Sequence, residues 1–121
     1  MEIEKFLEMA KSLDKRKKGK AEDLERLQKF FERFHNLNRA YLEREAFEKA
    51  QGSISTMAEA IATTVRYLDS EITRLRNKRM KLPFENVELG EMQKVQKRNE
   101  LLLKEHLTEV PKESSKLKVK S

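Results

Sequence analysis

The sequence has no cysteine and no tryptophan, only three glycines and two prolines, and aromatic residues make up just 7% of its 121 positions. Without cysteine, the chain can have no disulfide framework, no thiol nucleophile and no cysteine-ligated zinc. It also lacks any apolar run near the ~20 residues that a membrane span needs, and no apolar signal-peptide region follows the acidic start MEIEKF. These absences predict a cytoplasmic protein that does not enter a membrane.

Charged and helix-forming residues dominate what is present. Charged residues make up 40% of the chain and hydrophobic residues 37%. With so few glycines and prolines, this composition favours long amphipathic helices over a sheet. A chain of 121 residues is long enough for one domain with a buried core. We therefore expect a single helical domain over 1–111 and a disordered basic tail over 112–121.

Four helices are expected from apolar residues that recur at steps of three and four. Heptad steps run through the second helix, with Asn38 as a polar interruption. Thr56 and Glu59 have the spacing of a capping box at the start of the third helix, and Pro83 is expected to close it. The predicted helices span about 2–17, 21–50, 56–82 and 88–110.

The fold class follows from the short connection QGSIS between the second and third predicted helices. Short connections make consecutive helices antiparallel neighbours. We predict an all-α, elongated antiparallel (up-down) helical bundle of three to four helices, built on a long hairpin of 21–50 and 56–82. Apolar stripes would remain exposed at the thin ends of such a bundle, so self-association into a homo-oligomer is expected.

Residues suited to catalysis or metal binding are scarce. Glu32 and His35 have the Glu-x-x-His spacing of carboxylate-bridged metal sites in bundles, but such a site needs a second copy. Before His106, Leu103 stands where the second glutamate should be. The glycines are isolated, so no phosphate-binding loop is present. We therefore expect no enzyme, no metal, no cofactor and no small-molecule substrate.

One short motif, LERLQKFF, covers Leu24–Phe31. It resembles the sliding-clamp binding box of replication proteins, in which a glutamine is followed by an aliphatic residue three positions on and then by two aromatics. Leu27, Phe30 and Phe31 match that box, whereas Leu24 stands in the glutamine position. The resemblance implies a clamp-binding segment. The same residues also lie on the apolar face of the second predicted helix, so a role in the core is the alternative.

Helix 56–82 carries a polar surface that becomes strongly basic toward its end. Between Arg74 and Lys81, five of eight positions are cations and none is an acid. Helical spacing places one set of polar residues on a single face. We call this set the basic stripe: Thr63, Arg66, Ser70, Arg74, Asn77 and Lys81, with Tyr67 and Lys78 beside it. A separate basic cluster consists of Lys15, Arg16, Lys17, Lys18 and Lys20.

Arginine, lysine and neutral hydroxyl or amide donors are the side chains that bind phosphate oxygens. We therefore predict a non-enzymatic protein that binds the phosphate backbone of nucleic acid with little sequence specificity. It would serve as a nucleoid, replication-accessory or viral packaging component, and could then be nucleoid-associated. The basic stripe, the basic cluster and the tail would form the binding surface, and each phosphate contact would steepen the salt dependence of binding.

The alternative prediction is a protein–protein interaction module, meaning a helical adaptor or assembly subunit that self-associates or docks on a larger complex. Asn38 and Arg79 interrupt apolar stripes, as polar residues do when they set register across an interface. The cations of the basic stripe would then complement the helix dipole or pair with Glu85, Glu88 and Glu91. A large exposed apolar patch would favour this alternative, whereas a continuous positive face would favour nucleic-acid binding.

Overall fold

The computed structural model describes residues 2–15 and 20–120, with side chains described as far as Thr108 except that of Lys20. This part of the chain is helical, as predicted, and contains no strand. In chain order its elements are α1 (Glu2–Lys15), α2 (Lys20–Leu37), α3 (Arg44–Ala50), α4 (Ile54–Asn77) and α5 (Pro83–Lys120).

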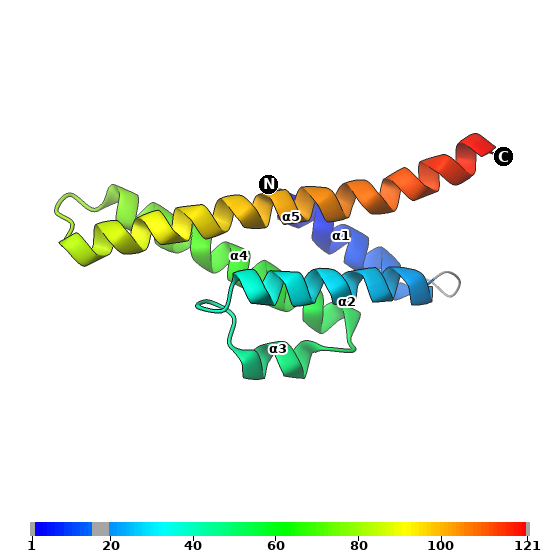
Figure 1. The fold of residues 1–121 in the computed structure, drawn as a ribbon, viewed down its shortest axis with the longest axis horizontal. Coiled ribbons are helices and arrows are strands. Elements are labelled where there is room, and N and C mark those ends of the chain that lie inside the picture. Colours follow the sequence, from blue (N-terminus) through cyan, green and yellow to red (C-terminus); the bar gives the residue numbers. More distant parts are fainter. Residues whose placement is uncertain (1, 16–19, 121) are drawn as a thin grey trace.

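The long hairpin of the molecule is formed by α4 and α5, which run antiparallel (Figure 1). α1 and α2 both pack against this pair, and the short α3 packs on α4. The molecule is therefore thick where α1 and α2 meet the hairpin. It thins to α4 and α5 alone toward the connection between them (Figure 1). The predicted hairpin of 21–50 and 56–82 is replaced by this arrangement.

Two apolar cores follow from this shape. The main core lies in the thick part, and its largest fully buried side chains are Ile3, Phe6, Leu27, Phe31, Phe34, Met57 and Ile61. A smaller core joins α4 and α5 in the thin part, and its buried members are Leu68, Leu75 and Met92. Each fully buried side chain of this size stabilises the fold by about 2 kcal/mol. Most of the stability therefore resides in the thick part.

A buried hydrogen-bond network lies where the two cores meet. The amides of Asn38 and Asn99, both fully buried, donate to each other's side-chain oxygen at 2.7 and 2.9 Å. Gln96 accepts from Asn99, and its own amide donates to the Val65 carbonyl oxygen at 2.9 Å and to Asp69. The network ties the end of α2 to α5 and α4. Asn38 therefore pairs within the chain and not across an interface with a partner.

The prediction of one helix over 21–50 is wrong, because the chain turns after α2 and forms a second helix, α3. At this turn, the backbone and side-chain N–H groups of Asn38 both donate to the carbonyl oxygen of Phe34. α3 folds back so that Phe47 stacks on His35, with 4.1 Å between the ring centroids. Because Phe47 covers His35 of α2, the turn that brings α3 back onto α2 is more stable than a straight continuation of α2.

The predicted capping box at the start of α4 is also wrong. Ser53 is the N-cap residue, and its Oγ accepts a hydrogen bond from the backbone N–H of Thr56 at 3.5 Å. Thr56 therefore lies inside the helix, and Glu59 does not cap it. Gly52 just before has a φ of 86°, in the left-handed region that glycine adopts without steric cost. This conformation turns the chain from α3 into α4.

α4 ends at Asn77, earlier than the predicted end at 82, and Pro83 opens α5 instead of closing α4. Proline is favoured at the first helical position, where its missing N–H is not needed. The carboxylate of Glu85 accepts a hydrogen bond from the backbone N–H of Leu82 at 3.0 Å, which caps the new helix. The predicted start at 88 is therefore too late.

At the other end, α5 continues to Lys120, past the predicted end at 110. The disordered tail predicted over 112–121 is not confirmed. α1 is described as far as Lys15, and residues 16 and 17 of the first predicted helix lie outside the described residues.

Candidate interaction surfaces

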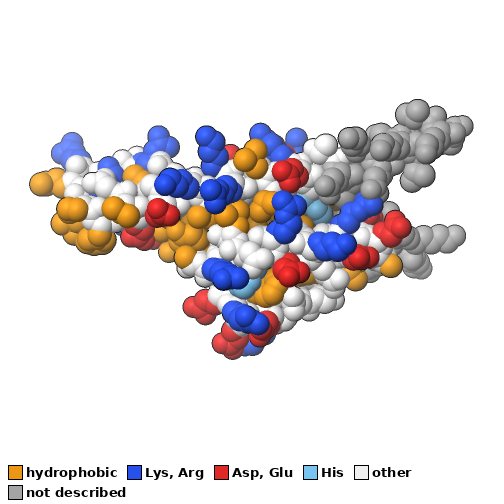
Figure 2. Space-filling view, viewed as in Figure 1, with side chains coloured by type: hydrophobic (Ala, Val, Ile, Leu, Met, Phe, Trp, Pro, Cys, Tyr) orange, Lys and Arg blue, Asp and Glu red, His pale blue; other side chains and the backbone are white. Residues whose placement is uncertain are grey.

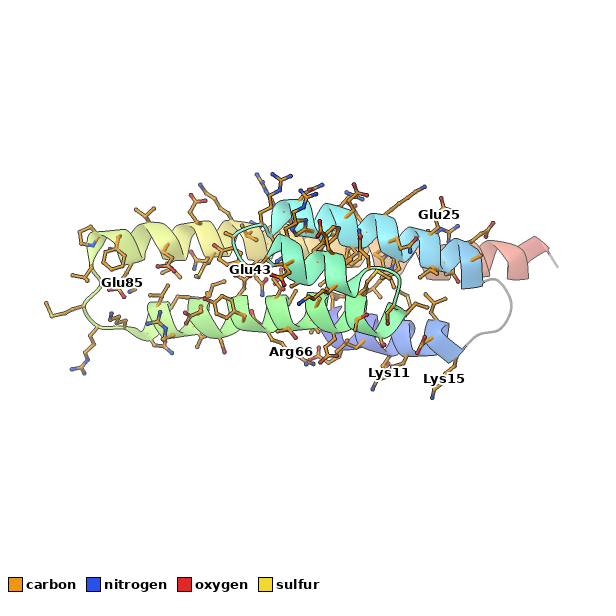
Figure 3. The ribbon with its side chains drawn as sticks, turned by 90° about the horizontal axis from the view of Figure 1, so that it is seen from below. Lys11, Lys15, Glu25, Glu43, Arg66 and Glu85 are labelled. Atoms are coloured by element: carbon orange, nitrogen blue, oxygen red, sulfur yellow. The ribbon has the colours of Figure 1, made fainter. Side chains whose placement is uncertain are left out.

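α4 places most of the basic stripe on one exposed face. The members on this face are Thr63, Arg66, Ser70, Arg74 and Asn77. They lie opposite the side of the helix that carries the buried Leu68, and Figure 3 shows Arg66 at the outer edge of α4. Lys78 and Lys81 lie in the α4–α5 connection, because the helix ends before them. The stripe is therefore shorter than predicted.

Ion pairs neutralise two of the cations assigned to this surface. Arg74 Nε donates to Glu71 Oε2 at 2.7 Å, and Lys78 Nζ donates to Glu85 Oε2 at 2.6 Å. Figure 3 shows Glu85 beside the connection of the hairpin. These hydrogen bonds lower the pKa of both carboxyl groups, so both stay ionised at neutral pH. The basic stripe is therefore not a continuous positive face.

Tyr67 lies beside the stripe and is 48% exposed. Its ring centroid lies 6.4 Å from that of Tyr41. Burial raises the pKa of Tyr41, and the nearby charges of Glu88 and Glu91 raise it further. Tyr41 thus stays neutral and packs against Tyr67, which leaves the other side of Tyr67 open to solvent.

The basic cluster is described only in part. Lys15 is exposed at the end of α1. Arg16, Lys17 and Lys18, together with the side chain of Lys20, lie outside the described residues, and the side chains of the tail do as well. Their contribution to a basic surface stays a prediction.

α5 carries a row of exposed cations that was not predicted. We call it the α5 row: Lys94, Lys97, Arg98 and Lys104. Helical spacing places these residues on one side of α5, and Figure 2 shows cationic side chains along the upper edge of the molecule, over α5. None of the four forms an ion pair with another described residue. The exposed acids Glu91 and Glu100 lie at its flanks.

The net charge of segment 83–111 gives no indication of the α5 row. Segment 83–111 holds more acids than cations, which indicated a mildly acidic helix. Glu85, however, is buried in the capping contact, and Glu105 pairs with Arg33 of α2 at 3.5 Å. The row becomes visible once charges are counted on the exposed face of α5 alone.

The connection of the hairpin exposes a group of apolar side chains, which we call the hairpin tip. Met80 is 87% exposed, Leu82 54%, Phe84 63% and Val87 67%. Figure 2 shows hydrophobic side chains gathered at this end of the molecule. Leu82 continues the apolar spacing of the predicted helix 56–82, but it is exposed here because α4 ends before it. Exposed apolar side chains that gather in this way mark interaction sites more often than isolated ones do.

A groove of about 560 Å³ lies between the turn before α3, α3 itself and the first half of α4. We call it the α3–α4 groove. Its apolar lining comes from Tyr41, Leu42, Ala46, Ala50 and Ala60. Glu43 and Glu59 also line it; both are exposed, and neither forms an ion pair with another described residue. Lys49 lines it as well, and its ammonium group pairs with Glu45 at 3.0 Å. The groove thus has an apolar floor and two free carboxylates.

Both histidines lie in the core and not at a reactive site. His35 stacks on Phe47, and His106 stacks on Phe30 with 4.6 Å between ring centroids. Burial lowers the pKa of His106 to about 4, with a smaller contribution in the same direction from Arg26. Within the described residues, no group of three or more histidines and acids is placed to hold a metal ion.

The segment that resembles the clamp-binding box is also part of the core. Leu27, Phe30 and Phe31 are 2%, 5% and 0% exposed. A box of this kind binds through these side chains, so α2 would have to leave the bundle to present them. The structure therefore supports the alternative, in which they are core residues.

Comparison of the chain with protein-family models, with curated proteins and with solved structures found no match. No helix in the described part of the chain is long and apolar enough to cross a membrane.

Proposed function

We propose that this protein is a non-enzymatic helical protein that binds nucleic acid through its phosphate backbone, with little sequence specificity. The observation that supports the proposal is the α5 row, in which exposed cations at helical spacing have no acid partner among the described residues. The row spans about 15 Å at 1.5 Å per residue. Duplex DNA presents one charge per ~1.7 Å of its axis, so several phosphates come within reach of the row.

The proposal moves the main contact from α4 to α5. Arg74 and Lys78 would have to break short ion pairs before they could bind phosphate, whereas the lysines of the α5 row need only release water. Arg66 of the basic stripe has no ion pair with a described residue and lies at the edge of α4, where it can add a further contact. Contacts from lysine and arginine to phosphate carry no sequence information, which agrees with binding that depends little on sequence.

Fluorescence anisotropy with labelled duplex and single-stranded DNA tests this function. The variant Lys94→Gln, Lys97→Gln, Arg98→Gln removes three charges of the row. Its matched control, Lys29→Gln, Arg44→Gln, Lys49→Gln, removes three cations from α2 and α3. Four phosphate contacts predict a slope of log K against log salt of about −3.5 on duplex DNA, and one remaining contact predicts about −1.

We expect the control to keep the steep slope and the row variant to lose it. Equal loss of binding in both variants would show that net charge alone attracts DNA. A wild type that does not bind at low salt would refute the proposal, provided that circular dichroism shows a folded protein.

The second candidate function is the protein–protein interaction module, an assembly subunit or adaptor. The exposed hairpin tip is the observation that favours it, because solvent exposure of four large apolar side chains is unfavourable in water. This function uses residues outside the α5 row, so the two functions can be tested separately.

A further inference from the structure

The hairpin tip combines apolar side chains with cations. Arg76, Arg79 and Lys81 lie in or next to it, and none of them forms an ion pair with another described residue. Two tips facing each other would bring like charges together, so a tip-to-tip dimer is disfavoured. The tip instead suits a surface that is apolar in the middle and acidic at the edge.

The α3–α4 groove has this composition. Its floor is formed by small and apolar side chains, which leave room for a protruding residue. Glu43 and Glu59 supply negative charge, while the positive charge of Lys49 is balanced by its ion pair with Glu45. Figure 3 shows Glu43 at the start of α3, at the edge of the groove region. An apolar, positively charged protrusion and an apolar, negatively charged groove are therefore both present on this chain.

The tip cannot reach the groove of its own molecule. α4 is one continuous helix of 24 residues that carries groove residues in its first half and leads to the tip at its end. The distance from Thr63 to Met80 is on the order of 25 Å at 1.5 Å per residue. A tip that fills this groove therefore belongs to another molecule.

We propose that the hairpin tip of one molecule docks in the α3–α4 groove of a second copy of this chain. Phe84 and Met80 enter the apolar floor, while Arg79 and Lys81 approach Glu59 and Glu43. The proposal rests on the second candidate function and names its partner. The contact is heterologous, because it joins two different surfaces, and the two end molecules of a chain of such contacts still offer a free tip and a free groove.

Two consequences follow from this geometry. Head-to-tail contacts build open filaments, or rings if the rotation between copies closes. The contact involves few side chains and lies at the small end of interface sizes, so we expect a dissociation constant on the order of 100 µM. Opposite charges contribute to the attraction, so the association should weaken as salt is raised.

Sedimentation velocity over a range of protein concentrations, without nucleic acid, tests the proposal. The tip variant is Met80→Asp, Phe84→Asp, and the groove variant is Ala46→Arg, Glu59→Lys. All four positions are exposed or line the groove, so the fold should survive. The matched control is Leu101→Asp on α5, which is 56% exposed and far from both surfaces in sequence.

We expect the wild type and the control to associate progressively, and each of the two variants to stay monomeric at about 500 µM, well above that dissociation constant. Mixed together, the variants should form a dimer and nothing larger, because the tip variant keeps its groove and the groove variant keeps its tip. A monomeric wild type at the same concentration would overturn the proposal. Association that persists in both variants would overturn it too, but would leave an assembly function on another surface. Neither result bears on DNA binding by the α5 row.

Discussion

The buried pair of Asn38 and Asn99 allows a quantitative test of the fold. Each amide is 0% exposed, and the two exchange hydrogen bonds of 2.7 and 2.9 Å. Asn38→Leu keeps the branched shape and the number of heavy atoms of the side chain but removes both bonds. It leaves the side-chain oxygen of Asn99 buried without a donor, which costs about 1–3 kcal/mol. Asn99→Leu leaves the matching oxygen of Asn38 unpaired and also removes a donor from Gln96.

The double variant separates the pair from its surroundings. With both asparagines replaced by leucine, neither amide is left unpaired. Gln96 loses the donor of Asn99, and the Phe34 carbonyl oxygen keeps the backbone N–H of residue 38 but loses the side-chain donor. We therefore expect each single variant to lower the free energy of unfolding by about 2–3 kcal/mol and the double variant by less than the sum. The difference, a coupling energy of about 1–3 kcal/mol, measures the reciprocal hydrogen bonds.

Urea unfolding followed by circular dichroism at 222 nm provides the four free energies of this cycle. The slope of free energy against urea should be the same for all four proteins, since the surface exposed on unfolding changes little. If the two substitutions are additive within ~0.5 kcal/mol, the asparagines do not interact and the junction of the two cores is packed in another way.

Two further predictions concern pH and the glycines. His106 has a pKa of about 4 in the fold and about 6.5 when unfolded, so its contribution to stability is complete above pH 6.5 and is lost as pH falls toward 4. Stability at pH 5 should be about 2 kcal/mol below that at pH 8, and His106→Leu should remove most of this difference in urea unfolding; an unchanged difference would assign it to other groups. Gly52→Ala should destabilise by about 1 kcal/mol through its φ of 86°, whereas Gly90→Ala, inside α5 with open space around it, should stabilise by about as much in thermal unfolding. Equal effects of the two would contradict the assigned conformations.

The helical class was predicted correctly, because composition and apolar periodicity report on helix formation between residues close together in the sequence. The prediction of one helix over 21–50 was wrong at the turn after α2, because the heptad steps continue through this turn without a break. What ends α2 is the burial of Phe47 on His35, a contact between residues on separate helices. Periodicity alone cannot show that the chain folds back to make such a contact.

The predicted end of α4 was wrong for a related reason. Leu82 continues the apolar spacing of the predicted helix 56–82, but it is exposed because α4 ends before it. Pro83 was read as a stop signal, yet the same residue is also a start signal at the first position of a helix. The hydrogen bond from the Leu82 backbone N–H to Glu85 favours the second role, because it caps a helix that begins at Pro83.

The candidate surfaces were predicted in part. Spacing correctly placed Arg66, Ser70 and Arg74 on one exposed face of α4. The alternative prediction included pairing with Glu85, and Lys78 meets Glu85 at 2.6 Å. Spacing could not show which cation forms this pair, because α4 ends before Lys78 and the pair joins the connection to α5. Charges on a helix are informative only after its inner and outer faces are known, and the outer face of α5 depends on which helices cover the inner one.

The two candidate functions use different parts of the α4–α5 hairpin. The Asn38–Asn99 network and the main core hold the thick part of the hairpin, whereas the thin part has only Leu68, Leu75 and Met92 as fully buried apolar residues. Segments with few buried contacts open more readily than the rest of a fold. A partner that covers the hairpin tip stabilises the closed form by mass action. Docking at the tip and order in the thin part of the hairpin are therefore linked, whereas the α5 row includes residues beside the main core and is held in place whether or not the tip is occupied.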